Sequence, residues 1–336
     1  MPLEGLPKIT VILVVLNEEK HIRLALESVL AQTFSTKSIE LIVVDGGSSD
    51  NTLSIINTFF EKNKDNFYKY FLLHNPKIIL ATGWNIGVEA STAPYVLRFD
   101  GHSQIDKSYI QEGINAFSEV GETAVAVGGW LHHEGDGVLG SCISAFYTSP
   151  FGGGSAAFRR KPKEVLESDT ALFAIYKKKA LLDAGLFNEQ QARNQDIELH
   201  KRLKKQGYKF FTVPGMEVTY HVRSSMKLLM TKAYNDGFWV GCSDGKLFRH
   251  LAPFFFLLYL LMGSIAAFID SSSIVLTLFL LSLGMYFLII YVDLLKRGGL
   301  TMTQRILNLG IFFSYHFQYG LGTAKGLLKP SGKKYE

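Results

Sequence analysis

The chain has 336 residues, enough for one large domain with an appended segment or for two ordinary domains. Hydrophobic residues make up 47% and charged residues only 19%, where a soluble protein usually carries about 25% charge, so the composition excludes a disordered chain. The two cysteines, Cys142 and Cys242, exclude a disulfide framework and a cysteine-rich zinc site, which predicts a reduced, cytosolic environment.

The amino-terminal part of the chain alternates between short apolar runs and amphipathic segments. The apolar runs predict strands over 9–16, 39–44, 70–73 and 95–99. The amphipathic segments predict helices over 20–32, 50–62 and 79–90. Because Asn17 and two glutamates follow the first run, it reads as a buried strand and not as a secretion signal. The alternation predicts an α/β fold with a mainly parallel sheet and helices on both faces.

Polar side chains follow three of these predicted strands. The first strand ends at Asn17, the second at Asp45-Gly46-Gly47-Ser48, and the fourth runs through Arg98-Phe99-Asp100-Gly101-His102. One Asp-Gly pair after a strand is most often a turn or a helix cap. Three polar strand ends in this order are harder to explain as three separate turns or caps. They favour a ligand site, because α/β folds bind ligands at the carboxyl ends of their strands.

On these residues the chain resembles the family 2 glycosyltransferases of the GT-A fold, which carry an N-E, a V-D-D-G-S and a D-x-D motif at the corresponding strands. More narrowly, it is similar to the succinoglycan-type membrane glucosyltransferases of exopolysaccharide synthesis. The stretches that carry this likeness are Arg98 to His102, Gly128 to Trp130, Pro150 to Gly154, Asp169-Thr170, Asn194 to Glu198 and Arg223 to Trp239. The resemblance covers nearly the whole chain and implies a Rossmann-like GT-A domain.

The resemblance implies a nucleotide-sugar donor that is bound by Asn17, Asp45, Ser48, Arg98 and Asp100. Asp45 would lie against the base and ribose, since a carboxylate can accept a hydrogen bond from a uracil ring, and uridine is the first expectation. Gly46 stands where the family often has a second acidic residue, which leaves the base open. Asn17 would orient the first loop or form a simple Asx turn.

The resemblance also implies a divalent cation, Mn²⁺ or Mg²⁺, held by Asp100 and His102. A hard cation bound by oxygen ligands and phosphates stabilises the negative charge of a diphosphate leaving group. His102 stands where the family at large has its second aspartate. Imidazole suits manganese better than magnesium. The alternative for His102 is an ordinary turn histidine.

Asp196 matches the catalytic aspartate of the family, at the start of a predicted helix that Asn194 would cap. Transfer with inversion needs a general base for the acceptor hydroxyl. From the pattern alone, an acidic residue in a first helical turn is also favoured by the helix dipole. The acceptor-side residues that we expect are Gly153, Gly154, Asp169, Glu198, His221 and Trp239.

These acceptor-side assignments have plain structural alternatives. The glycines would let backbone approach a ligand closely, or they belong to a ligand-free loop. His221 would reach the diphosphate or act as a structural histidine, and Glu198 would orient a neighbour. Trp239 lies where processive synthases carry Q-x-x-R-W. Since that motif is absent, we expect addition of a single sugar.

Two uncharged runs predict membrane helices over 251–269 and 271–292, joined by a turn at Asp270. A third segment, 306–328, predicts an interfacial or third membrane helix. We therefore expect a cytosolic GT-A domain over 1–250 and a membrane domain over 251–336. The alternative is a pair of core helices in a larger soluble domain.

The segment after residue 250 carries seven basic and three acidic residues, or four of the five net positive charges. This placement favours anionic lipid headgroups as partners over nucleic acid. We expect a multi-pass protein of the inner (cytoplasmic) membrane with its catalytic domain in the cytosol.

The leading hypothesis is inverting, metal-dependent, non-processive transfer of a hexose, with a UDP-sugar as first donor, to a polyprenyl-diphosphate-linked saccharide in exopolysaccharide or capsule assembly. The alternatives are a polyprenyl-phosphate sugar synthase and a catalytically silent membrane scaffold.

Overall fold

The computed structural model describes residues 8–153, 157–159, 161–191, 195–222, 224–242, 248–269 and 273–329. The chain divides into two compact units. Within the described residues, the first unit lies within 8–132 and 157–221, and the second within 133–153 and 222–329. An internal segment of the chain thus packs with the carboxy-terminal helices.

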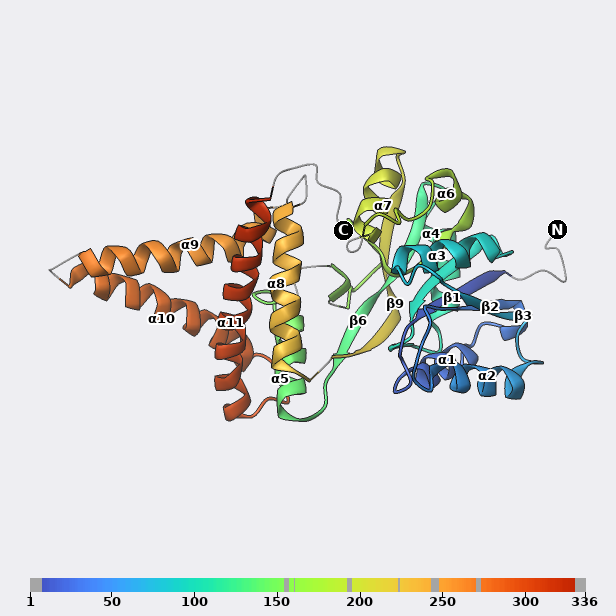
Figure 1. The fold of residues 1–336 in the computed structure, drawn as a ribbon, viewed down its shortest axis with the longest axis horizontal. Coiled ribbons are helices and arrows are strands. Elements are labelled where there is room, and N and C mark those ends of the chain that lie inside the picture. Colours follow the sequence, from blue (N-terminus) through green and yellow to red (C-terminus); the bar gives the residue numbers. More distant parts are fainter. Residues whose placement is uncertain are drawn as a thin grey trace. The chain divides into compact units, whose positions relative to one another are not determined.

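The first unit is built on a mixed sheet (Figure 1). Within the described residues its strands are β1 (Ile9–Val15), β2 (Ile39–Asp45), β3 (Lys69–His74), β4 (Tyr95–Asp100), β5 (Ser103–Ile105), β6 (Ala124–Glu134), β7 (Leu166–Ser168), β8 (Leu172–Lys177) and β9 (Lys209–His221). Their order is β3-β2-β1-β4-β8-β6-β9-β5, and β7 pairs with β9. The first four strands run parallel to one another, while β8 pairs antiparallel with both β4 and β6.

Helices cover both faces of this sheet, as predicted. One face packs against α1 (Ile22–Leu30), α2 (Thr52–Asn63) and α4 (Tyr109–Val120), and the other against α3 (Leu80–Ala90), α6 (Lys178–Asp183) and α7 (Gln195–Lys205). Successive strand residues point to opposite faces, so Val11 and Leu13 enter the first core while Ile12 enters the second. Two short 3₁₀ helices, Thr36–Ser38 and Ala157–Arg159, lie in connections. The predicted α/β fold is confirmed.

The second unit consists of helices, with α11 (Met302–Leu327) packed against four others (Figure 1). These are α5 (Gly137–Thr148), α8 (Met226–Cys242), α9 (Phe248–Ile269) and α10 (Ile274–Leu295). Glycines bring α8 and α11 into close contact: a Cβ at Gly237 would overlap the carbonyl oxygen of Tyr319, and one at Gly322 that of Tyr234. Only glycine leaves room for two backbones this close.

Among the described residues, two helical segments are long and apolar enough to cross a membrane: His250–Ile269 and Ile274–Leu295. Their most apolar stretches are 0% and 6% buried, so these helices do not form the core of a soluble domain. The third predicted segment forms most of α11, which is not one of these two candidate spans. The predicted turn at Asp270 lies outside the described residues.

Candidate active site

The loops after β1 and β2 are fastened to each other by hydrogen bonds. The backbone N–H of Asn17 donates to Ser48 Oγ over 2.9 Å, and Asn17 Oδ1 accepts from the N–H of Ser49 over 2.8 Å. Asn17 adopts a left-handed conformation, with φ of 54°. The Asn17 side chain thus connects the two loops and does not close a turn within its own loop. The backbone N–H of Glu18 makes a further connection by donating to Thr52 Oγ1.

Asp45 ends β2 and organises the turn that follows it. Its carboxylate accepts from the N–H of Gly47 over 2.8 Å, from the N–H of Ser48 over 3.0 Å, and from Ser48 Oγ over 2.6 Å. The side chain is buried, and these donors satisfy most of its acceptor capacity. Asp45 and Ser48, both predicted to bind the donor, thus lie together and fix the shape of one loop.

Asp100 ends β4 on the other side of β1 from Asp45. In the sheet register Val15 pairs with Asp45 and Val14 with Asp100, so β1 lies between the two aspartates. Two strand spacings separate their backbones by about 10 Å. The two predicted carboxylates therefore belong to one edge of the parallel half of the sheet.

His102 follows Asp100 and contacts Glu18 from the first loop. The distance from His102 Nδ1 to Glu18 Oε1 is 3.0 Å, and the ring also meets Tyr220 edge-on at 5.4 Å between centroids. Both side chains of the Glu18 pair are partly buried, at 26% and 15% exposure. The sequence did not single out Glu18, although it belongs to the N-E motif of the first strand end.

His221, at the end of β9, lies in the same neighbourhood. Its Nε2 is 2.7 Å from Gln104 Nε2, whose amide donates the hydrogen bond, and its ring stacks on His21 at 5.8 Å. Burial lowers the pKa of His21, Glu18 opposes this shift, and His221 and His102 add to it. The structure therefore brings His221 together with the His102 cluster.

The side chains at this edge offer few ligands to a divalent cation. Within the part of the chain that the structure describes, no group of three or more His, Cys, Asp or Glu side chains is arranged to hold a metal ion. A site with one or two protein ligands nevertheless fits a cation that takes its other oxygen ligands from substrate phosphates. The carboxylate of Glu18 on one nitrogen of His102 is a typical arrangement for a metal-binding histidine. Asp100 and His102 fit a cation shared with a phosphate ligand, and they do not fit an all-protein cage.

Asp196 lies in the first turn of α7 and faces Arg98 from β4. The distance from Asp196 Oδ2 to Arg98 Nη2 is 3.7 Å, with side-chain exposures of 24% and 13%. Burial disfavours the charge of Arg98, but Asp196, Tyr176 and Asp100 together outweigh this and raise its pKa above the ordinary value, with Asp196 contributing the largest share of the rise. The guanidinium of Arg98 therefore pairs with Asp196 from another element of the fold. Asn194, the predicted cap of α7, lies outside the described residues.

Aromatic rings hold Arg98 in place on the α3 side of the sheet. Its guanidinium lies 5.3 Å from the centre of the Trp84 ring and 6.0 Å from that of Phe187. Asn85 fixes the second ring, because its side chain donates to the carbonyl of Phe187 and accepts from its N–H, both over 2.9 Å. The structure thus gives Arg98 aromatic and carboxylate neighbours.

One helical turn after Asp196, His200 is buried between two hydroxyl groups. Its Nδ1 is 2.7 Å from Thr170 Oγ1 and its Nε2 is 2.8 Å from Tyr176 Oη. Burial lowers the pKa of His200 to about 3, so the imidazole is neutral at physiological pH. Each ring nitrogen thus has a partner, and this contact ties α7 to β8.

The remaining predicted residues are divided between the two units. Glu198 forms an ion pair with Arg202 at 2.7 Å, so it orients a neighbour, and Asp169 contacts Lys204 at 2.8 Å with its side chain 75% exposed. Gly153 and Trp239 belong to the second unit. Gly154 lies outside the described residues.

Residues 10–183 match the family described as glycosyl transferase family 2, over slightly more than half of the chain. The chain belongs to this family. It is a glycosyltransferase with a GT-A-type α/β fold, and the resemblance that the motifs indicated is confirmed.

Two curated relatives of this family 2 glycosyltransferase cover much of its length. One, from Methanococcus voltae, is named dolichyl N-acetyl-alpha-D-glucosaminyl phosphate 3-beta-D-2,3-diacetamido-2,3-dideoxy-beta-D-glucuronosyltransferase. It is 26% identical, over 96% of this chain and 97% of that protein. The succinoglycan biosynthesis protein ExoA of Rhizobium meliloti is 23% identical over 66% of each chain.

A solved structure shares the fold of this glycosyltransferase. The mannosyltransferase PcManGT from Pyrobaculum calidifontis, in complex with GDP-Man and Mn²⁺, superimposes with a TM-score of 0.67 at 17% identity. The match covers 96% of this chain and 87% of that one.

Sequence reasoning missed several residues around the predicted site. His200 carried a usable signal, because it stands four residues after Asp196 and so lies on the same face of one helix. Trp84, Asn85 and Tyr176 carried none, since apolar or amide residues inside helices and strands are usually part of the core.

Proposed function

We propose that this glycosyltransferase moves one sugar from a nucleotide-sugar donor, with a UDP-hexose as the first choice, to a polyprenyl-diphosphate-linked saccharide, with inversion at the anomeric carbon. The observation that carries the proposal is the 3.7 Å ion pair between Asp196 on α7 and Arg98 on β4, the strand that ends at Asp100. It supports a base and a cation ligand at one edge of the sheet, where α/β folds bind their ligands.

The donor would bind across the loops after β1 and β2. Asn17 and Ser48 join these loops, and Asp45 shapes the turn that would receive the nucleoside. A loop whose backbone is already fixed by hydrogen bonds loses little conformational entropy when a ligand binds. The internal bonds of Asp45 therefore favour a role in shaping the nucleoside site as well as in touching the base.

Asp100 and His102 would hold a divalent cation, Mn²⁺ or Mg²⁺, against the diphosphate of the donor. When bound, such a cation offsets the negative charge that develops on the diphosphate leaving group. Glu18 would keep the His102 ring oriented through Nδ1, so that Nε2 serves as the ligand. The fold shared with a mannosyltransferase solved with Mn²⁺ supports this choice of ion.

Asp196 would act as the general base. Its carboxylate accepts the proton of the acceptor hydroxyl while that oxygen bonds to the anomeric carbon, and the bond from this carbon to the diphosphate breaks. Attack from the side opposite the leaving group inverts the configuration. Arg98 would hold the Asp196 carboxylate in position through their ion pair.

The two apolar helices would anchor the enzyme in the inner membrane, with the glycosyltransferase unit on the cytosolic side. An acceptor carried on a polyprenyl chain has its reactive hydroxyl near the headgroups, so anchoring raises its effective concentration. The name of the Methanococcus voltae relative, which contains a dolichyl-linked sugar phosphate, supports a lipid-linked acceptor.

The proposal is tested with the full chain in phospholipid nanodiscs and a panel of UDP- and GDP-sugars. The acceptors are polyprenyl phosphate and polyprenyl-diphosphate-linked N-acetylglucosamine. We expect nucleotide diphosphate release and a product extended by one sugar on the saccharide-bearing lipid, both abolished by EDTA and restored by Mn²⁺. Transfer to polyprenyl phosphate alone would instead identify a polyprenyl-phosphate sugar synthase. Absence of both donor binding and turnover would identify a silent scaffold.

A further inference from the structure

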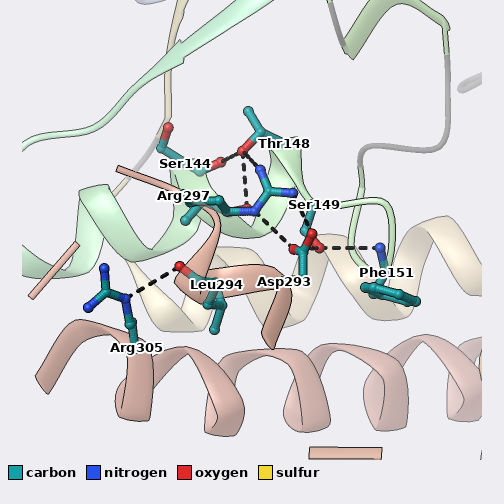
Figure 2. Close-up of polar contacts among 9 residues, drawn as sticks. Ser144, Thr148, Ser149, Phe151, Asp293, Leu294, Arg297 and Arg305 are labelled. Atoms are coloured by element: carbon teal, nitrogen blue, oxygen red, sulfur yellow. Dashed lines mark hydrogen bonds and ion pairs between the residues drawn. The ribbon is translucent and has the colours of Figure 1, made fainter. Parts of the chain in front are cut away.

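The end of α10 is fixed to both α5 and α11 within the second unit (Figure 2). Asp293, paired with Arg297 at 2.9 Å, also accepts a hydrogen bond from Ser149 Oγ at the end of α5 over 2.8 Å. Arg305, in the first turn of α11, donates from Nε to the carbonyl of Leu294 over 3.4 Å. Leu294 belongs to the last turn of the second candidate span. The start of α11 therefore lies at one end of a candidate membrane span.

Further along, α11 meets the beginning of the first candidate span. A Cβ at Gly320 would lie 2.5 Å from the carbonyl oxygen of Pro253, so the backbones of α11 and α9 are in direct contact there. Pro253 belongs to the first turn of the span His250–Ile269. The two spans contact each other, since Tyr259 Oη donates to the carbonyl of Phe279 over 3.3 Å. The beginning of the first span and the end of the second therefore lie together, at the open end of a helical hairpin.

In consequence α11 runs across the open end of this hairpin (Figure 1). Arg305 and Gly320 are 15 residues apart, or about 22 Å along a helix, yet both contact this end. If α11 crossed a bilayer beside the spans, Gly320 would lie most of the way through a hydrocarbon core about 30 Å thick. The observed contacts instead place Arg305 and Gly320 on the same side of that core.

One face of α11 carries only apolar residues and glycine. The residues of this face, which we call the apolar stripe, are spaced by three or four positions and are Met302, Ile306, Gly310, Phe313, Phe317, Leu321 and Ala324. Met302 is 59% exposed and Ile306 55%, and a Cβ at Gly310 would meet no atom within 4 Å. The opposite face, with Phe312 and Tyr315, is buried against neighbouring helices. A helix with one buried face and one exposed apolar face suits a surface that is itself apolar.

The apolar stripe is continuous with the apolar surface of the hairpin. Phe313, in the middle of the stripe, contacts Phe256 of α9 and Phe287 of α10, at 5.8 Å and 6.0 Å between ring centres. Arg305 and Lys325 flank the stripe on its two sides. Such side chains can cover apolar surface with their stems and extend their charges to lipid phosphates. An apolar face that is bordered by cations fits the boundary between the hydrocarbon and the headgroups of a phospholipid leaflet.

We propose that α11 lies along the membrane surface, with the apolar stripe at the headgroup boundary of one leaflet, and does not cross the bilayer. The hairpin then crosses the membrane, and α11 rests on the leaflet at its open end. The segment 306–328, for which the sequence allowed an interfacial or a third membrane helix, is then interfacial. This proposal rests on the proposed function only for the crossing of a membrane by the hairpin, and the first experiment tests that crossing separately.

The first experiment determines from which side of a membrane single cysteines react. The full chain, with Cys142→Ala and Cys242→Ser, is placed in sealed inverted and right-side-out vesicles and treated with a membrane-impermeant maleimide. Three exposed positions are compared: Lys296→Cys at the open end of the hairpin, Ser273→Cys at its turn, and Lys325→Cys at the far end of α11. We expect Lys325→Cys and Lys296→Cys to react from one side, and Ser273→Cys from the other.

Two other outcomes have separate meanings. Reaction of Lys325→Cys from the same side as Ser273→Cys would overturn the proposal, because α11 would then cross the membrane, and would leave the anchoring hairpin in place. Reaction of all three cysteines from one side would show that the hairpin does not cross. That result would overturn both the proposal and the membrane anchor in the proposed function.

The second experiment measures the depth of α11 and identifies what covers the apolar stripe. In the same background, in phospholipid vesicles, a nitroxide on Gly310→Cys is compared with one on Met285→Cys, which is 56% exposed in the middle of α10. From collisions with O₂ and with a nickel chelate, we expect the label on Gly310→Cys about 5–10 Å below the headgroups and the label on Met285→Cys about 15 Å deep. Equal depths would overturn the proposal. Dipolar broadening between labels on Gly310→Cys, with protection from O₂, would identify a second copy of the chain as the occupant and would also overturn it.

Discussion

The two units of this glycosyltransferase present their polar residues in different ways. In the first, polar side chains follow parallel strands, and neighbours such as Asp45 and Ser48 bond within a few residues of each other. In the second, Ser149 and Asp293 meet although 144 residues separate them in the sequence. The first arrangement produces motifs that a sequence displays, and the second produces contacts that only the fold reveals.

This contrast indicates a division of work between the units. The strand edge of the first unit gathers carboxylates, histidines and a half-buried arginine, which are the groups that we propose for the chemistry. The second unit uses glycine-mediated helix packing and ion pairs such as that of Asp293 with Arg297, which are suited to holding a shape. Substitutions in the first unit should therefore change turnover, and those in the second should change stability.

The largest effect is expected from Asp196→Asn. The amide cannot accept the proton of the acceptor hydroxyl, so kcat for transfer should fall by about 10³-fold, within the range of general-base catalysis. Donor affinity, measured by calorimetry, should change little. Asp183→Asn, in an exposed pair with Lys179, serves as the control and should keep full activity. Transfer that persists in Asp196→Asn would remove this residue from the catalytic role.

Arg98→Gln separates the motif-based role of Arg98 from the role that the structure supports. If Arg98 positions Asp196, kcat should fall by about 10- to 100-fold while the Kd for the donor is retained. If Arg98 binds the donor directly, as its motif implied, the donor Kd should weaken instead. Measuring both constants on one preparation decides between the two roles.

The parallel strands and their helices were predictable from the sequence. Short apolar runs mark β1 to β4, and apolar residues at helical spacing mark α1 to α3. The strand ends were predictable for the same reason, since parallel strands deliver their carboxyl ends to one edge. The partner of Arg98 was not, because it comes from α7, far along the chain. The contact of α5 with α11 was also unpredictable, since an apolar segment does not reveal which helix covers it.

Gly322→Ala tests the close packing of α8 against α11. The added methyl group would overlap the backbone of Tyr234, so we expect a loss of about 1–3 kcal/mol, which is typical of overpacking. The melting temperature in detergent should fall by several degrees. Gly310→Ala on the same helix is the matched control, because its Cβ would meet no atom within 4 Å. Equal melting temperatures of the two variants would contradict the packing account.

The last effect, which is absent at neutral pH and appears only in acid, is expected from the buried imidazole of His200. Its pKa is about 3 in the folded chain against 6.5 ordinarily, so the unfolded chain binds an extra proton between these values. Its contribution to stability is therefore present above pH 6.5 and is lost as the pH falls toward 3, by at most about 1.4 kcal/mol per pH unit. In His200→Gln the free energy of unfolding, measured by denaturant titration, should decrease less steeply than in the wild type as the pH falls from 6.5 to about 4. An identical slope in both proteins would exclude a neutral buried His200.

The central claim is that Asp100 and His102 serve the donor phosphates while Asp196 serves the acceptor. It is tested most directly by calorimetry of UDP binding with and without Mn²⁺ in the wild type, Asp100→Asn and Asp196→Asn. The account predicts that Mn²⁺ strengthens UDP binding in the wild type and in Asp196→Asn, and that this gain is lost in Asp100→Asn. An equal gain from Mn²⁺ in all three proteins would contradict it.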